Sequence, residues 1–86
     1  MISIKIEEFD AENKALFIKK GEKNLWGLVS LMQFEDEMDY YGISLERKLI
    51  NGEKGYIFSK DVDEDLLYEE TKRFLEEHSV ENLDAF

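Results

Sequence analysis

The start of the chain alternates apolar and polar residues in short runs, which is typical of strands. Isoleucine occupies every second position over residues 2–6, so we expect a strand with one buried face. Residues 9–13 predict a turn, and residues 15–19 predict a second short strand. The polar, glycine-containing segment 20–24 then predicts a further hairpin turn. A pair of antiparallel strands therefore opens the predicted fold.

Residues 25–34 are nearly all apolar, and their pattern fits either a strand or a helix. The helical interpretation rests on the spacing of four apolar residues, Leu25, Leu28, Val29 and Met32. Asn24 is a fair N-cap for such a helix, whereas Gly27 would destabilise it by about 1 kcal/mol. Because the flanking loops are short, as in a sheet meander, we favour a central strand.

Further strands are predicted between this segment and residue 60. Apolar residues alternate with others over 41–45, which indicates a strand. Residues 51–55 contain two glycines and predict a hairpin loop that leads into another strand over 56–58. The chain up to residue 60 is thus expected to form a sheet meander.

The pattern changes to a helical period after Lys60. One stripe along the predicted helix is formed by Leu67, Thr71, Phe74, Leu75 and His78, and the opposite face carries Glu69, Glu70, Arg73, Glu76 and Glu77. Asp61 and Glu64 have the spacing of a capping box. We therefore expect a helix over about 62–78, followed by a short C-terminal tail over 79–86.

Together these elements predict one α+β domain over residues 1–86. Its β-rich part, residues 1–60, forms an antiparallel sheet meander of about five strands, and one C-terminal α-helix packs on the sheet. Apolar residues make up 43% of the chain, which is enough for a core and argues against disorder.

Residues suited to catalysis or metal binding are scarce. Cysteine is absent, which excludes disulfides, cysteine-ligated zinc and thiol nucleophiles. The single histidine, His78, lies on the predicted inner stripe without a catalytic pattern near it. Residues 61–65 carry Asp at alternate positions, as a calcium loop begins, but Leu66 and Lys72 stand where that loop needs Gly and Glu. We expect no enzyme activity, no cofactor and no metal site, and weak binding of a divalent cation at Asp61–Asp65 is left open as the alternative.

Charge is distributed unevenly along the chain and narrows the class of partner. The formal net charge is −10, and residues 61–86 contribute −8 of it with ten acids and two bases. Nucleic-acid phosphates and anionic membranes repel such a protein, so we expect no direct nucleic acid and no membrane partner. The complementary partner is a basic protein surface, as on a nucleic-acid-binding protein or a nuclease.

Location follows from the same features. No apolar run approaches the ~18 residues of a membrane span, and the start of the chain shows neither a basic leader nor an apolar signal core. We therefore expect a cytoplasmic protein, in the host cell cytoplasm if a phage encodes it. The sequence leaves the oligomeric state open.

Two acidic clusters are the candidate partner-binding residues. The first comprises Glu35, Asp36, Glu37 and Asp39, with Tyr40 as an aromatic anchor if its ring points outward. The second comprises Asp63, Glu64, Asp65, Glu69, Glu70, Glu76 and Glu77. Its two Glu-Glu pairs start about 10 Å apart along a helix, close to the span of three nucleotides at ~3.4 Å each. The helix is thus able to imitate a row of phosphates.

In size, acidity and lack of catalytic residues, the chain resembles phage-encoded inhibitors of host defence, such as anti-CRISPR proteins and the uracil-DNA glycosylase inhibitor. The likeness is one of overall character, without a shared motif. It implies a small acidic inhibitor that blocks a basic nucleic-acid-binding protein as a DNA mimic does. Two alternatives stay open: an immunity protein or antitoxin that neutralises a basic toxin, and a housekeeping domain whose acidity only confers solubility.

Overall fold

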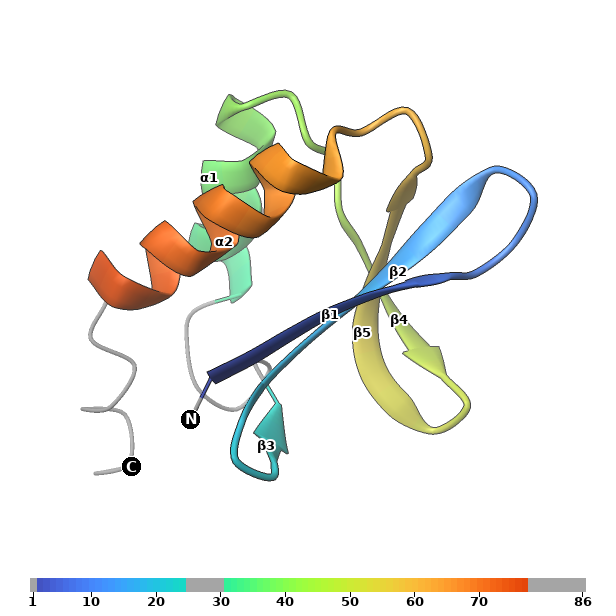
Figure 1. Ribbon diagram of the computed structural model, residues 1–86, viewed down its shortest axis with the longest axis horizontal. Coiled ribbons are helices and arrows are strands. Elements are labelled where there is room, and N and C mark those ends of the chain that lie inside the picture. Colours follow the sequence, from blue (N-terminus) through green and yellow to red (C-terminus); the bar gives the residue numbers. More distant parts are fainter. Residues whose placement is uncertain (1, 25–30, 78–86) are drawn as a thin grey trace.

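The computed structural model describes residues 2–24 and 31–77 of the chain (Figure 1). In chain order the elements are β1 (Ile2–Glu8), β2 (Asn13–Lys20), β3 (Lys23–Asn24), α1 (Leu31–Tyr40), β4 (Glu46–Ile50), β5 (Glu53–Ser59) and α2 (Glu64–Glu77). The expectations for residues 25–30, for His78 and for the tail 79–86 fall outside the described residues.

The α+β fold with an antiparallel sheet is confirmed, but the described residues form two helices rather than the single C-terminal helix expected. The sheet is also not the expected meander, because β2 pairs with β5. Four strands lie in the order β1-β2-β5-β4, and the two-residue β3 pairs with the end of β2. Both helices lie on the same face of the sheet (Figure 1). Neither helix in the described part of the chain has the length and apolar character that crossing a membrane requires.

The opening hairpin is confirmed. β1 and β2 pair in one regular register, with Ile4 opposite Ile18 and Ile6 opposite Leu16, so the alternate isoleucines of β1 face the helices. A turn at Gly21, whose φ of 63° favours glycine, then reverses the chain into β3. The predicted helix is also confirmed, because Leu67, Thr71, Phe74 and Leu75 are all buried in α2.

The strand expected over residues 25–34 is wrong where the structure describes it, because Leu31–Phe34 begin α1. β2 pairs directly with β5, so no strand lies between them. Phe34 and Met38 are buried at a spacing of four residues, and this helical period continues beyond the apolar run through the acidic cluster. The predicted element ended at Phe34 because the run of apolar residues ends there, whereas the helix continues to Tyr40.

The strand expected over 41–45 is also wrong, because these residues form the connection between the end of α1 and the start of β4. Gly42, with φ of 80°, donates its backbone N–H to Asp39, and Ile43 donates to Met38. This pattern is a Schellman motif, in which glycine takes the left-handed position after a helix. The strand itself, β4, follows at Glu46–Ile50.

The hairpin between β4 and β5 is tighter than the predicted loop over 51–55. Asn51 and Gly52 both have positive φ, 53° and 82°, as a two-residue type I′ turn requires. Residues 53–55 therefore belong to β5. Gly55 is needed inside this strand because a Cβ there would lie 2.8 Å from the ring of Phe17, which covers the sheet face away from the helices.

The capping box proposed for α2 is replaced by a cap at Asp63. Its Oδ1 accepts the backbone N–H groups of Asp65 at 3.0 Å and Leu66 at 3.3 Å. Helix α2 accordingly begins at Glu64, two residues later than expected from the pairing of Asp61 with Glu64. One acid of the second cluster thus has a structural role at the helix N-terminus.

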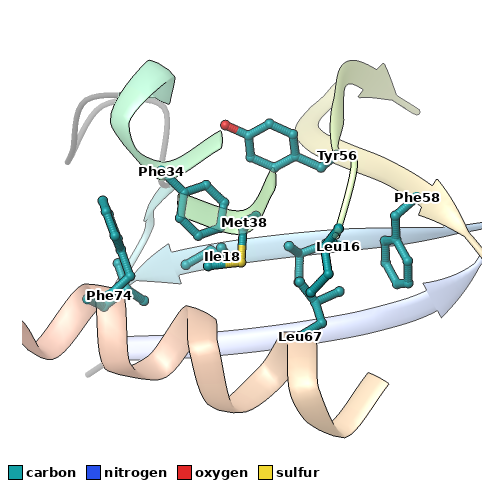
Figure 2. Packing of buried hydrophobic residues seen from close by; sticks show 10 residues of the cluster. Leu16, Ile18, Phe34, Met38, Tyr56, Phe58, Leu67 and Phe74 are labelled. Carbon is teal, nitrogen blue, oxygen red and sulfur yellow. The ribbon is translucent and has the colours of Figure 1, made fainter. Parts of the chain in front are cut away.

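Phe34 is the centre of the core between the helices and the sheet (Figure 2). Its ring centroid lies 5.7 Å from that of Tyr56 in β5 and 5.2 Å from that of Phe74 in α2. Aromatic pairs at such distances add about 0.5–1.5 kcal/mol beyond the area they bury. This packing holds α1 against both the sheet and α2.

We expect Asp63→Ala to lower the free energy of unfolding by about 1 kcal/mol, because the cap of α2 is lost. Asp61→Ala, which removes an equal charge two residues earlier, is the matched control and should stay within about 0.5 kcal/mol. Urea unfolding followed by circular dichroism measures both. Equal losses in the two variants would contradict the assignment of the cap to Asp63.

Candidate functional site

Helix α1 carries its acids and two large apolar side chains on the side away from the core. We call the α1 face the exposed residues Met32, Gln33, Asp36, Asp39 and Tyr40. Tyr40 is 83% exposed and Met32 is 68% exposed, although both are large apolar or aromatic side chains. They lie opposite Phe34 and Met38, whose burial fixes the rotation of the helix.

The two tyrosines at the end of α1 point in different directions, which was the condition set for Tyr40 as an anchor. Tyr40 is in solvent, whereas Tyr41 is half-buried and packs against the core. Their rings meet edge to face with centroids 5.2 Å apart. Burial of Tyr41 and its hydrogen bond with Glu70 raise the pKa of the Tyr41 hydroxyl. Tyr41 therefore supports the exposed ring beside it.

An open hollow of about 380 Å³ lies on this helix, between Gln33, Asp36, Glu37 and Tyr40. The hollow combines two carboxylates, an amide and the side of an aromatic ring. Carboxylates bind guanidinium or ammonium groups, and the face of a tyrosine ring attracts the same cations. Its chemistry suits a basic side chain.

Glu35 is not part of this surface, although it belongs to the same predicted cluster. Its carboxylate accepts hydrogen bonds from Arg47 at 2.5 Å and 3.2 Å and from the Tyr56 hydroxyl at 3.0 Å. Burial of the Tyr56 ring, followed by this contact with Glu35, raises the pKa of the Tyr56 hydroxyl. Glu35 thus docks α1 onto β4 and β5.

The remaining acids of the first cluster have no such role. Among the described residues, no lysine or arginine forms an ion pair with Asp36, Glu37 or Asp39. Helix α1 itself contains no basic residue, and these acids occupy its C-terminal half. The negative end of the helix dipole lies there, so Glu37 and Asp39 in the last turn each destabilise the helix by up to about 1 kcal/mol.

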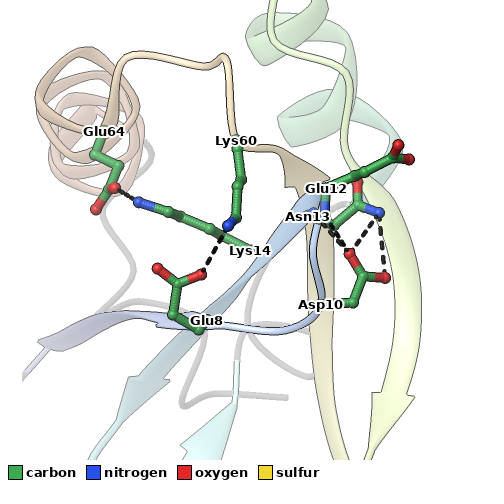
Figure 3. Close-up of polar contacts among 7 residues, drawn as sticks. All are labelled: Glu8, Asp10, Glu12, Asn13, Lys14, Lys60 and Glu64. Atoms are coloured by element: carbon green, nitrogen blue, oxygen red, sulfur yellow. Dashed lines mark hydrogen bonds and ion pairs between the residues drawn. The ribbon is translucent and has the colours of Figure 1, made fainter.

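The first-turn acids of α2 are explained by the fold. Glu64 forms an ion pair with Lys14 of β2 (Figure 3). Asp63 caps the helix, and Asp65 is exposed. The contact with Glu64 raises the pKa of the Lys14 ammonium. Acids at this end are favoured by the helix dipole. In the part of the chain that the structure describes, no three acidic or histidine side chains gather in a way that could hold a metal ion.

Glu70 corrects the expected acidic face of α2, because it is only 7% exposed. It lies on the side of the helix turned toward α1, interacts with Tyr41, and pairs with Arg73 at 3.3 Å. The buried stripe of α2 is therefore wider than the sequence pattern suggested. The row of two Glu-Glu pairs is lost, since only the acids at 69, 76 and 77 remain exposed.

Basic residues interrupt what is left of the α2 row. Glu69 and Glu76 point outward from the core, but Lys72 and Arg73 are exposed between them. The α1 face has no such interruption. It is therefore the stronger candidate for binding a cationic partner.

Comparisons with protein-family models, curated proteins and solved structures find no match to this chain. The surface is accordingly interpreted from its own geometry.

Met32 is the residue of the α1 face that sequence reasoning missed. It stands four residues before Asp36 and eight before Tyr40, which places all three on one side of a helix. This spacing was hidden because residues 25–34 were assigned to a strand. A helical assignment through Tyr40 would have revealed it.

The contact between Glu35 and Tyr56 predicts a measurable effect on stability. Tyr56→Phe should lower the free energy of unfolding by about 1.5–3 kcal/mol at neutral pH, because a hydrogen bond to a charged group is lost. The folded-state pKa of Tyr56 is raised, so the neutral hydroxyl stabilises the fold below the unfolded pKa of about 10 and loses this effect as pH rises further. Wild type should therefore lose stability above pH ~10 more steeply than Tyr56→Phe.

Tyr40→Phe is the matched control, since Tyr40 is exposed. Its stability should stay within about 0.5 kcal/mol of wild type at neutral pH. Chemical unfolding at a series of pH values measures all three proteins. Parallel alkaline curves for wild type and Tyr56→Phe would contradict the role given to the Tyr56 hydroxyl.

Proposed function

We propose that this protein binds a basic surface of another protein through the α1 face, as an inhibitor that covers a nucleic-acid-binding site does. The observation that carries the proposal is the group of acids near the exposed ring of Tyr40 that form no ion pair with any base whose side chain the structure describes. Asp36 stands one helical turn before Tyr40, Asp39 directly precedes it, and Glu37 lines the hollow beside it.

The cost of this arrangement supports the proposal. The acids stand at the end of α1 where the helix dipole disfavours them, and no base occupies the last turn. Solubility of a small domain needs a net charge of only about 2–8 in magnitude, which this chain exceeds. Exposed Met32 and Tyr40 add apolar surface that solubility does not favour. Recognition of a partner accounts for all of these features together.

The chemistry of the face supports a cationic partner. Arginine is suited to pair with a carboxylate while it stacks on an aromatic ring, so Asp36, Glu37 and Tyr40 offer a place for it. The net charge of −10 steers a basic protein toward this surface and speeds association. Nucleic-acid-binding proteins carry such basic patches, and a bound acidic protein excludes the phosphates.

The experiment uses wild type, an α1 variant and an α2 variant as baits in cell lysate. The α1 variant combines Asp36→Lys, Asp39→Lys and Tyr40→Ala, and the α2 variant combines Glu69→Lys with Glu77→Lys, so both change the net charge equally. We expect wild type to capture a nucleic-acid-binding protein that short duplex DNA releases. With the purified partner, the α1 variant should bind at least ~30-fold more weakly, as loss of an aromatic anchor predicts.

The α2 variant is the control for net charge alone and should lose affinity by less than about tenfold, mainly through slower association. Binding of the wild type should weaken steeply with salt. Equal affinity of wild type and the α1 variant would contradict the role of the α1 face. Capture of a basic toxin that DNA does not displace would instead favour the immunity-protein hypothesis.

A further inference from the structure

Strand β1 leaves a long regular edge of the sheet without a partner among the described strands. It is the first strand in the order β1-β2-β5-β4, and all seven of its residues pair with β2 in one register without a bulge. None of the described strands pairs with the backbone N–H and C=O groups on its other edge. Such an edge is a template for pairing with another chain.

The opposite edge of the sheet is protected differently. β4 has only five residues and carries Glu46, Arg47 and Lys48 in succession, all exposed. Short strands with charged side chains are common devices against edge pairing. β1 lacks this protection on the side that faces the helices, where its residues are Ile2, Ile4 and Ile6.

A groove of about 270 Å³ runs between this edge and α2. Its walls are formed by Ile2, Ile4, Tyr68, Lys72, Leu75 and Glu76. Leu75 is buried there, whereas Tyr68 remains 42% exposed. A strand added about 4.8 Å from β1 would place every second side chain in this groove. The backbone edge and the groove thus point to one occupant, an extended segment with alternate apolar residues.

β1 is itself a segment of that kind. When two copies of β1 pair antiparallel about Ile4, the Ile2 of one copy stands opposite the Ile6 of the other, and Ser3 stands opposite Lys5. This register places no like charges directly opposite each other. It also extends the isoleucine stripe across both copies, beneath the two α2 helices. The interface is self-complementary, as a two-fold dimer requires.

The charges at the rim of the groove fit the same arrangement. Lys72 and Glu76 lie four residues apart on α2, and both line the groove. A two-fold axis sets the two α2 helices antiparallel, so the rim of each groove, with its one base and one acid, would meet the same pair of opposite charges on the other copy. The rim is neutral although the chain carries a net charge of −10. This local charge balance favours a second copy as the occupant.

We propose that the protein forms a two-fold homodimer in which the β1 strands of two copies pair edge to edge and the β1–α2 grooves close on each other. The inference goes beyond the proposed function, because the α1 face lies on the other helix and stays exposed in the dimer. Salt acts oppositely on the two interactions. It screens the repulsion between two acidic chains and strengthens the dimer, whereas it weakens binding to a basic partner.

Analytical ultracentrifugation over a range of protein concentrations, at low and high salt, tests the dimer. We expect a reversible dimer whose dissociation constant falls as salt rises. Ile4→Lys places two lysines at the axis and should weaken dimerisation by at least about tenfold. Leu49→Lys is the matched control on the β4 edge, where Leu49 is 62% exposed, and it should dimerise as wild type does.

A charge swap keeps the test valid if Ile4→Lys disturbs the fold. Lys72→Glu should weaken the dimer, because it leaves only acids at the rim, and Lys72→Glu combined with Glu76→Lys should restore it. Both positions are exposed, so circular dichroism should show an unchanged fold. A wild type that stays monomeric at high salt would overturn the proposal, as would a dimer that neither Ile4→Lys nor Lys72→Glu weakens.

Discussion

The position of α1 on the sheet depends on the hydrogen bonds that the Glu35 carboxylate accepts. This carboxylate receives hydrogen bonds from Arg47 of β4 and Tyr56 of β5, so one acid joins the helix to two strands. Phe34, the preceding residue, packs between Tyr56 and Phe74. A half-buried charge without these partners would be strongly destabilising, which makes the contact specific for one rotation of the helix. That rotation places Asp36 and Tyr40 in solvent.

The acids of this protein divide into those that stabilise the fold and those that do not. Asp63 caps α2, Glu64 pairs with Lys14, and Glu70 joins Arg73 and Tyr41. Glu35 belongs with them. The acids of the α1 face have the opposite character, since they stand in the half of α1 nearer the unfavourable end of the helix dipole, and α1 itself contains no base. The net charge is therefore a poor guide to function until the acids with structural roles are set aside.

Sequence alone predicted those elements whose periodicity is complete within the element. The alternating isoleucines of β1 and the buried stripe of α2 are such cases. Helix α1 was not predicted because most of its apolar residues precede its acids in the sequence. The apolar residues were assigned to a strand, and the acids after them were assigned to no element. Gly42 marked the end of that helix, but a glycine in a Schellman motif and a glycine in a strand turn look alike in sequence.

The site was harder to predict than the fold because exposure depends on neighbouring elements. Glu70 is next to Glu69 in sequence, yet α1 packs on one side of α2 and covers only Glu70. In the same way, the path of the chain after β5 determines that Asp63, and not Asp61, caps α2. Such choices between adjacent residues rest on contacts from distant segments, which local patterns do not contain.

The two proposed surfaces also constrain each other. Pairing of β1 strands about a two-fold axis perpendicular to the sheet keeps all four helices on one side, with the two α2 helices central and the two α1 helices outermost. The dimer would then present two α1 faces to one partner. A basic surface that follows a nucleic acid is extended, so it is able to meet both faces, and the second contact forms at a high effective concentration. Weak binding by each α1 face would thereby suffice for a tight complex, which gives the edge pairing of β1 a functional consequence.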